Sequence, residues 1–204
     1  VVLNVAADHL DWHGSLAAYG DAKGKIYAGT RVAVANADDP VSVRLAEGGG
    51  EQVAFTLDTP KPGELGVAGS ELVDRAFGAD SAVLAEVADV HPPGPHNLAN
   101  ALAAAALARA HGVPATAVRE GLRSFEPGVH RSVEVAEIDG VRYVDDSKAT
   151  NPHAAAAALA AHPRVVWIAG GLLKGAEVDD LVAAHADRLD GVVLMGTDRA
   201  PFRD

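Results

Sequence analysis

The sequence contains no cysteine, which excludes disulfide bonds and thiolate zinc sites. Basic residues are few: 17 Lys and Arg stand against 28 Asp and Glu, for a net charge of −11. A binder of nucleic acid or of an anionic membrane would need a basic surface, so we expect neither partner. No apolar run approaches the roughly 20 residues of a membrane-spanning helix, and no signal peptide is recognisable. We therefore expect a soluble, cytoplasmic protein.

Three common motifs are also missing from the sequence: GxxxxGK[ST], GxGxxG and GxSxG. The composition is that of a globular protein, with 49% hydrophobic and 22% charged residues. A length of 204 residues suits one large domain or two small ones. The first residue is Val, and strand-like segments lie close to both ends. We interpret the sequence as part of a longer protein.

The order of apolar segments predicts an α/β fold in two lobes, residues 1–126 and 127–204. In the first lobe we expect strands at 1–5 and 31–35 around a helix at 16–29, then short strands at 51–57, 65–68, 71–73 and 81–87. Helices at 96–111 and 115–124 complete it. After Glu126-Pro127-Gly128, Asp139-Gly140 predicts a hairpin. A helix at 152–161, a strand at 165–169, a helix at 178–189 and a strand at 192–195 continue a doubly wound pattern.

The first candidate site follows the strand at 1–5. It is the run Asp8-His9-Leu10-Asp11-Trp12-His13. Open α/β sheets bind ligands at the carboxyl ends of their strands, and Asp with His suits a divalent metal ion. The alternative is a solvated loop in which an Asp caps the next helix.

The second candidate is Lys23. At about 100° per residue, it falls in the middle of a helical stripe that is otherwise apolar, while Lys25 points the opposite way. The other members of the stripe are Leu16, Tyr19, Ile26 and Tyr27. A lysine on a core-facing stripe loses hydration, which favours the neutral amine, and a neutral amine can form a carbamate with carbon dioxide. The alternative is a lysine that extends its ammonium group to the surface.

Two shorter motifs follow. Asn97 and Asn100 are three residues apart in the first turn of a predicted helix, so they share a face and could bind the edge of a purine. The alternative is that one of them caps the helix. His130 and Arg131 follow the expected lobe boundary, and an arginine can hold phosphate oxygens in a bidentate way.

The last candidate joins a strand end to a helix N-terminus, a position that favours anions. It is the run Asp145-Asp146-Ser147-Lys148-Ala149-Thr150-Asn151-Pro152, in which Thr150 or Asn151 must also cap the helix. Gly170-Gly171 and Lys174 occupy the equivalent place after the next strand. Two loops that carry lysines predict a basic pocket on an acidic protein, and hence anionic ligands.

Taken in this order, these motifs resemble the Mur ligases of peptidoglycan synthesis. Asn4 to Asp11 with Tyr19 to Tyr27 is similar to the family's metal and carbamate segment, and His96 to Leu102 to its adenine-side motif. His130-Arg131 is similar to its interdomain phosphate pair. The string Asp146 to Asn151 resembles the branch that adds D-glutamate to UDP-N-acetylmuramoyl-L-alanine. The resemblance implies the last part of a central ATPase-type, parallel-sheet domain over residues 1–126, followed by a truncated, Rossmann-like C-terminal domain over 127–204.

The resemblance also implies roles. His9 and carbamylated Lys23 would bind Mg²⁺, and Asn97, Asn100 and His130 would lie at the ATP. Arg131, Asp146 and Lys148 would hold its phosphates or ribose, while Thr150 and Lys174 would meet the carboxylates of D-glutamate. Lys23, His9, Arg131 and Lys148 would be the catalytic set. A substrate carboxylate would attack the γ-phosphate to give an acyl phosphate, and the D-glutamate amine would displace phosphate. We expect a monomer that acts on small molecules.

Other functions stay open. The family's phosphate loop and its UDP-binding domain have no counterpart in these residues, so we expect the 204-residue chain alone to be inactive in ligation. Another Mur-type or folylpolyglutamate-type ligase is an alternative. A second is a carbamate-bridged metal hydrolase built on Asp8, His9, His13 and Lys23. A third is a non-catalytic nucleotide-binding module.

Overall fold

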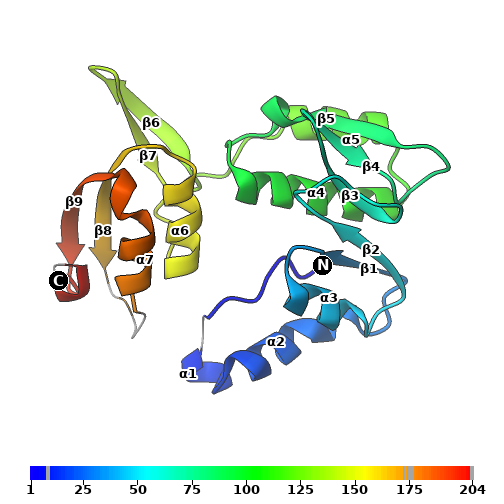
Figure 1. Ribbon diagram of the computed structural model, residues 1–204, viewed down its shortest axis with the longest axis horizontal. Coiled ribbons are helices and arrows are strands. Elements are labelled where there is room, and N and C mark those ends of the chain that lie inside the picture. Colours follow the sequence, from blue (N-terminus) through cyan, green and yellow to red (C-terminus); the bar gives the residue numbers. More distant parts are fainter. Residues whose placement is uncertain (8–9, 172, 174–176, 203–204) are drawn as a thin grey trace. The chain divides into compact units, whose positions relative to one another are not determined.

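The computed structural model describes residues 1–7, 10–171, 173 and 177–202. The chain forms two compact units, Val1–Glu126 and Pro127–Asp204, which divide within the Glu126-Pro127-Gly128 segment. Each unit combines helices with β-structure, so the expected α/β class is confirmed (Figure 1). Of the helices in the described ranges, none has the length and apolar character needed to cross a membrane.

The first unit is built on one mixed sheet of five strands. In spatial order they are β1 (Val32–Asn36), β2 (Glu51–Phe55), β3 (Glu64–Ala68), β4 (Glu71–Asp74) and β5 (Ala82–Glu86). β1, β2 and β3 pair in parallel, as expected, whereas β3, β4 and β5 pair antiparallel. Only Gly69 and Ser70 separate β3 from β4, too few residues for the crossover that a parallel pair requires.

Helices cover both faces of this sheet (Figure 1). The helices of the unit are α1 (Leu10–His13), α2 (Leu16–Gly24), α3 (Pro40–Ala46), α4 (Pro95–Ala110) and α5 (Ala115–Arg123), with 3₁₀ turns η1 (Lys25–Tyr27) and η2 (Val87–Asp89). Of these, α3, α4 and α5 contact the sheet. The helix expected at 16–29 is thus shorter and ends in a 3₁₀ turn. Alternate residues of β1 point to opposite faces: Val34 packs in the core beneath α4, and Ala33 and Ala35 pack with Tyr27 and α3.

Residues 1–5 do not form the expected strand. They make one isolated bridge to the sheet, between Val2 and Ala35, and side chains hold the rest of the segment. The buried Tyr27 hydroxyl accepts from the Val2 N–H (2.8 Å) and donates to the Val34 carbonyl (2.7 Å). The Asn36 amide donates to the Leu3 carbonyl (3.0 Å). Residues 1–5 make almost no strand hydrogen bonds to β1. The side chains of Tyr27 and Asn36 therefore satisfy the backbone N–H of Val2 and the carbonyl of Leu3.

The second unit contains two separate two-stranded sheets. β6 (Val133–Ile138) and β7 (Val141–Asp145) form the hairpin predicted at Asp139-Gly140, and both turn residues have the positive φ of a type I′ turn. β8 (Val165–Gly171) and β9 (Leu189–Gly196) pair in parallel. The helices are α6 (Pro152–Ala160) and α7 (Asp179–His185), with 3₁₀ turns η3 (Ala186–Arg188) and η4 (Ala200–Phe202). The expected continuous doubly wound pattern is therefore limited to β8, α7 and β9, since the hairpin is a sheet of its own.

Gly170 permits the close approach of β8 and β9 at their carboxyl ends. Its φ is +129°, and a Cβ at this position would collide with the Met195 carbonyl. Any side chain here would push the two strands apart, because the obstacle is backbone and cannot rotate away.

A buried ion pair ties β4 to the end of α4. The Asp74 carboxylate is fully buried and accepts from Arg109 Nε at 2.7 Å, while its other oxygen accepts from the N–H groups of Ala76 and Phe77. Arg109 also donates to the Phe77 and Val113 carbonyls. With both charges and most donors satisfied, this pair fixes the helix against the antiparallel part of the sheet.

We expect Asp74→Ala to lower the free energy of unfolding by about 3 kcal/mol, because the Arg109 charge would stay buried without its partner. Urea denaturation monitored by circular dichroism measures this. The matched control is Arg123→Ala, which breaks the exposed Arg123–Asp89 pair and should cost much less, because solvent screens an exposed pair. Equal losses for the two variants would contradict the role given to burial.

Candidate functional site

Four of the predicted site residues gather at the open end of the β6–β7 hairpin: His130, Arg131, Asp146 and Lys148. The strand register pairs Val133 with Asp145, so the segments before β6 and after β7 leave the hairpin side by side. Val135 is the extra residue of a β-bulge. It shifts the pairing by one residue between the turn and the open end of the hairpin. The turn and the bulge together set which residues meet at this end.

Hydrogen bonds lock the two segments to each other. His130 Nδ1 lies 2.6 Å from Asp145 Oδ2, and the Ser132 N–H donates to Asp146 Oδ1 (2.9 Å). The Lys148 N–H donates to the His130 carbonyl (3.2 Å). We name this set of residues, 130–132 with 145–148, the hairpin-mouth cluster.

The cluster holds its backbone in an unfavourable conformation on both sides of Arg131. His130 has φ +67° and Ser132 has φ +51°, in the left-handed region that residues with a Cβ rarely adopt. Each such residue costs on the order of 1–2 kcal/mol, which the cross-links of the cluster must offset. Strain of this kind is common where a side chain has to be presented to a ligand.

The charges of the cluster leave two cations available. Asp145 is engaged with His130, and among the described residues neither Arg131 nor Lys148 forms an ion pair with a carboxylate. Both side chains are exposed. The His130 hydrogen bond, helped by the Ser147 N–H, lowers the pKa of Asp145 to about 2. A fixed carboxylate beside two exposed cations forms a site that can bind an anion and also orient it.

The loop continues into α6, whose first turn confirms one of the predicted roles. Asn151 Oδ1 accepts from the Ala154 N–H (2.8 Å) and caps the helix, so Thr150 is not needed as the cap. Thr150 is exposed just before the helix. Lys174, predicted in the next loop, lies outside the described residues.

Asn97 and Asn100 lie on one face of α4 in the first unit, as predicted. Asn100 Nδ2 is 3.5 Å from Asn97 Oδ1, and Asn97 is half-buried. Gly94 occupies the N-cap position without a side-chain bond, so neither asparagine caps the helix. The two amides bond to each other instead of capping the helix.

The surroundings of Lys23 differ from the expected stripe. Leu16 and Ile26 are exposed, by 45% and 57%, so the stripe does not face the core as a whole; only Tyr27 is deeply buried. The helix ends at Gly24, so Ile26 and Tyr27 follow the pitch of η1, while Leu16 is exposed although it lies within α2. Lys23 is nevertheless half-buried while Lys25 is exposed.

The Lys23 side chain lies over one aromatic ring. Its Nζ is 4.9 Å from the centre of the Tyr19 ring, and the His13 and Tyr19 ring centres are 5.0 Å apart. The Tyr19 ring thus positions the Lys23 amine through a cation–π contact. Asp8 and His9, the other predicted metal-binding residues, lie outside the described residues. Across the residues that are described, no three His, Asp or Glu side chains converge on a possible metal position.

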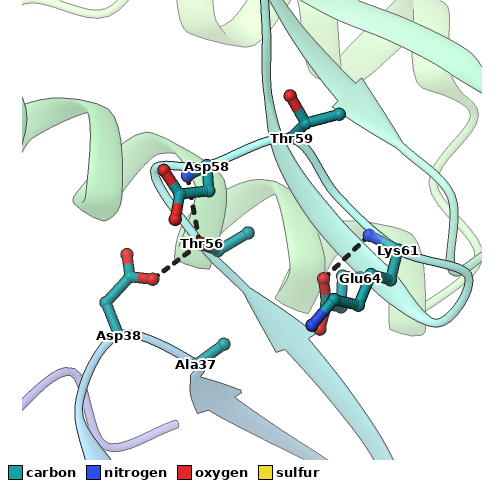
Figure 2. Close-up of a pocket in the computed structure, with 7 residues that line it drawn as sticks. All are labelled: Ala37, Asp38, Thr56, Asp58, Thr59, Lys61 and Glu64. Atoms are coloured by element: carbon teal, nitrogen blue, oxygen red, sulfur yellow. Dashed lines mark hydrogen bonds between the residues drawn. The ribbon is translucent and has the colours of Figure 1, made fainter.

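One further site in the first unit was not predicted from the sequence. A cavity of about 500 Å³ opens at the carboxyl ends of β1 and β2, lined by Ala37, Asp38, Thr56, Asp58, Thr59, Lys61 and Glu64 (Figure 2). Asp38 accepts from the Thr56 hydroxyl (2.6 Å) and the Leu57 N–H (2.8 Å). The sequence did contain a sign of this cavity, because polar residues follow β1 and β2 at the edge where open α/β sheets bind ligands. None of the predicted site residues lines this cavity.

Comparison with known proteins gives the same domain order as the structure. The profile of the Mur ligase middle domain matches residues 1–108, and that of the Mur ligase, glutamate ligase domain matches residues 130–204. The chain belongs to the Mur ligase family. Within it, the chain is 62% identical to a UDP-N-acetylmuramoylalanine--D-glutamate ligase of Streptomyces avermitilis and 57% identical to one of Thermobifida fusca. It is covered completely in both cases, against 46% and 45% of those proteins. The chain spans about half the length of these curated relatives.

Solved structures support the fold alone, because their sequences are distant. MurF from Acinetobacter baumannii has a TM-score of 0.68 at 19% identity, over 94% of this chain and 49% of that one. MurC from Thermotoga maritima has a TM-score of 0.66 at 22% identity, over 98% and 46%. FolC of E. coli in complex with ADP has a TM-score of 0.66 at 22% identity, over 97% of this chain and 47% of that one.

We expect the Asp145 carboxyl to titrate near pH 2, and its pKa to rise towards the ordinary 3.9 in His130→Ala. A carboxyl with a lowered pKa stabilises the folded state above its unfolded-state pKa, and this contribution is lost as the pH falls towards 2. The ¹³C shift of the side-chain carboxyl measures the titration. His111→Ala, an exposed histidine of the first unit, is the control and should change nothing. An unchanged Asp145 titration in His130→Ala would contradict the assignment.

Proposed function

We propose that this chain is part of an ATP-dependent ligase that joins D-glutamate to UDP-N-acetylmuramoyl-L-alanine in peptidoglycan synthesis. The observation that carries the proposal is the 62% identity, over the whole chain, to a protein named as that ligase. The substrate carboxylate would take the γ-phosphate of ATP, and the amine of D-glutamate would then displace phosphate from the acyl phosphate. The enzyme would work in the cytoplasm as a monomer.

The hairpin-mouth cluster supports the ATP part of the proposal. Arg131 and Lys148 supply two exposed cations, and Asp146 keeps Oδ2 without a partner among the described residues. Arginine grips phosphate oxygens in pairs, lysine acts as a point charge, and a carboxylate accepts from ribose hydroxyls. This donor set fits a nucleoside triphosphate. His130 would contact the nucleotide together with Arg131, Asp146 and Lys148.

The remaining roles follow from the family resemblance. Asn97 and Asn100 would contact the purine, since an amide both donates and accepts. Thr150 and Lys174 would meet the carboxylates of D-glutamate. Asn97 lies in the first turn of α4 and Thr150 just before α6, positions where binding residues are frequent in α/β proteins.

Magnesium is proposed on the resemblance, with His9 and carbamylated Lys23 as its ligands. His9 lies outside the described residues, and Lys23 Nζ lies over the Tyr19 ring. When bound, the ion would add positive charge near the γ-phosphate, where negative charge accumulates during transfer.

Three alternatives make predictions that calorimetric titration and activity assays separate. A nucleotide-binding module would bind ATP with no response to D-glutamate, whereas a ligase should bind each ligand more tightly when its partners are present. A carbamate-bridged hydrolase would act without ATP, and its metal content and hydrolysis of simple esters or amides would identify it. A folylpolyglutamate-type ligase would respond to L-glutamate instead.

We expect Lys23→Ala to abolish ligation in a complete enzyme that contains this sequence, with partial recovery on addition of short carboxylic acids. The acid would replace the anionic oxygens of the carbamate. The matched control is Lys25→Ala, an exposed lysine two residues away, which should keep near-normal turnover. Phosphate release in steady-state assays measures both. Normal turnover of Lys23→Ala, or equal losses in the two variants, would overturn the role of Lys23.

A further inference from the structure

Asp145 is not a residue that the proposed function uses, yet it makes the shortest contact of the hairpin-mouth cluster. Its Oδ2 lies 2.6 Å from His130 Nδ1, and its Oδ1 accepts from the Ser147 N–H at 3.0 Å. A carboxylate can only accept, so the Nδ1 of His130 must carry the proton in this bond. The carboxylate thus fixes the imidazole tautomer and leaves Nε2 directed away from Asp145.

The position of Asp145 lets one carboxylate act on both segments of the cluster. Through Oδ2 it holds His130, the residue before Arg131, and through Oδ1 it holds the turn that leads to Lys148. The His130 carbonyl in turn accepts from the Lys148 N–H. The two exposed cations are therefore attached to backbone that meets at a single side chain.

The conformation that Asp145 holds is strained. His130 and Ser132 both have positive φ, so the chain on either side of Arg131 would relax to an extended or helical conformation without cross-links. Asp146 supplies one cross-link through the Ser132 N–H, and Asp145 supplies the other through the His130 side chain. Loss of either lets the backbone that carries Arg131 move.

We propose that Asp145 is a positioning residue: by holding His130 it keeps the strained turn in place and presents Arg131 next to Lys148 for binding of a nucleotide polyphosphate. The proposal rests on the proposed function for the ligand, and on the contacts of the cluster for the mechanism. Asp145 itself touches no phosphate in this scheme, because two negative charges would repel each other.

The test compares Asp145→Ala and Asp145→Asn with Glu137→Gln, an exposed carboxylate at the closed end of the same hairpin. In a complete ligase, Asp145→Ala should raise the KM for ATP about tenfold, the effect expected for one charge-assisted hydrogen bond. The KM for D-glutamate should stay within about twofold, since Asp145 acts on the phosphate side of the cluster alone. Asp145→Asn keeps one acceptor oxygen, so its KM for ATP should lie between those of Asp145→Ala and the wild type.

A double-mutant cycle identifies His130 as the residue through which Asp145 acts. His130→Ala should also raise the KM for ATP, and because the two residues share one contact, the double variant should raise it by clearly less than the product of the two single factors. Additive effects would contradict the proposal, as would an unchanged KM for ATP in Asp145→Ala. If Asp145→Ala does not fold, Asp145→Asn and His130→Ala carry the same comparison.

A second readout is independent of any ligand. Backbone chemical shifts of residues 130–132 and 146–148 in the 204-residue chain report the conformation of the turn, and they should change in Asp145→Asn but not in Glu137→Gln. If the turn changes while the wild-type enzyme binds no ATP, the proposed function fails and the mechanical role of Asp145 stands. If ATP binds and the turn does not change, the role given to Asp145 is wrong.

Discussion

The register of one hairpin determines which residues can act together in the second unit. The Asp139-Gly140 turn starts the pairing, and the bulge at Val135 moves it by one residue, so that Asp145 lies opposite Val133. Without the bulge, Asp145 would lie opposite Glu134, and the segment with His130 and Arg131 would be displaced by one residue along the strand. Because side chains alternate between the faces of a strand, a displacement of one residue also turns each of them to the other face.

The electrostatics of this site follow from how the carboxylates are used. The chain carries a net charge of −11, so an exposed cation has many potential partners of opposite sign. In the hairpin-mouth cluster the carboxylates bind elsewhere: Asp145 to His130 and Ser147, and Asp146 to the Ser132 N–H. Arg131 and Lys148 remain without carboxylate partners in the described part of the chain, which leaves their charge for an incoming anion.

Features that depend on neighbours in the sequence could be predicted from it. The hairpin turn needs positive φ at two adjacent residues, which Asp-Gly tolerates, and Asn151 caps the helix that follows it. The shared face of Asn97 and Asn100 follows from helix geometry alone. Whether the domains and site residues have the roles that the resemblance implies stays a prediction.

Features that depend on distant residues could not be predicted. The contact between His130 and Asp145 needs the bulge, which no local pattern announces. The burial of the Lys23 face depends on which distant segments pack against α2, and the cavity beside Asp38 depends on how the loops after two strands pack. The antiparallel half of the first sheet could have been inferred, because the two residues between β3 and β4 allow only a tight reversal.

The manner in which Val2 is held has a consequence for the order of folding. Its backbone N–H and carbonyl are bound by Tyr27 and Ser42, which lie 25 and 40 residues further along the chain. The backbone of Val2 therefore cannot be fixed in place until residues far along the chain have been synthesised and have packed against the sheet.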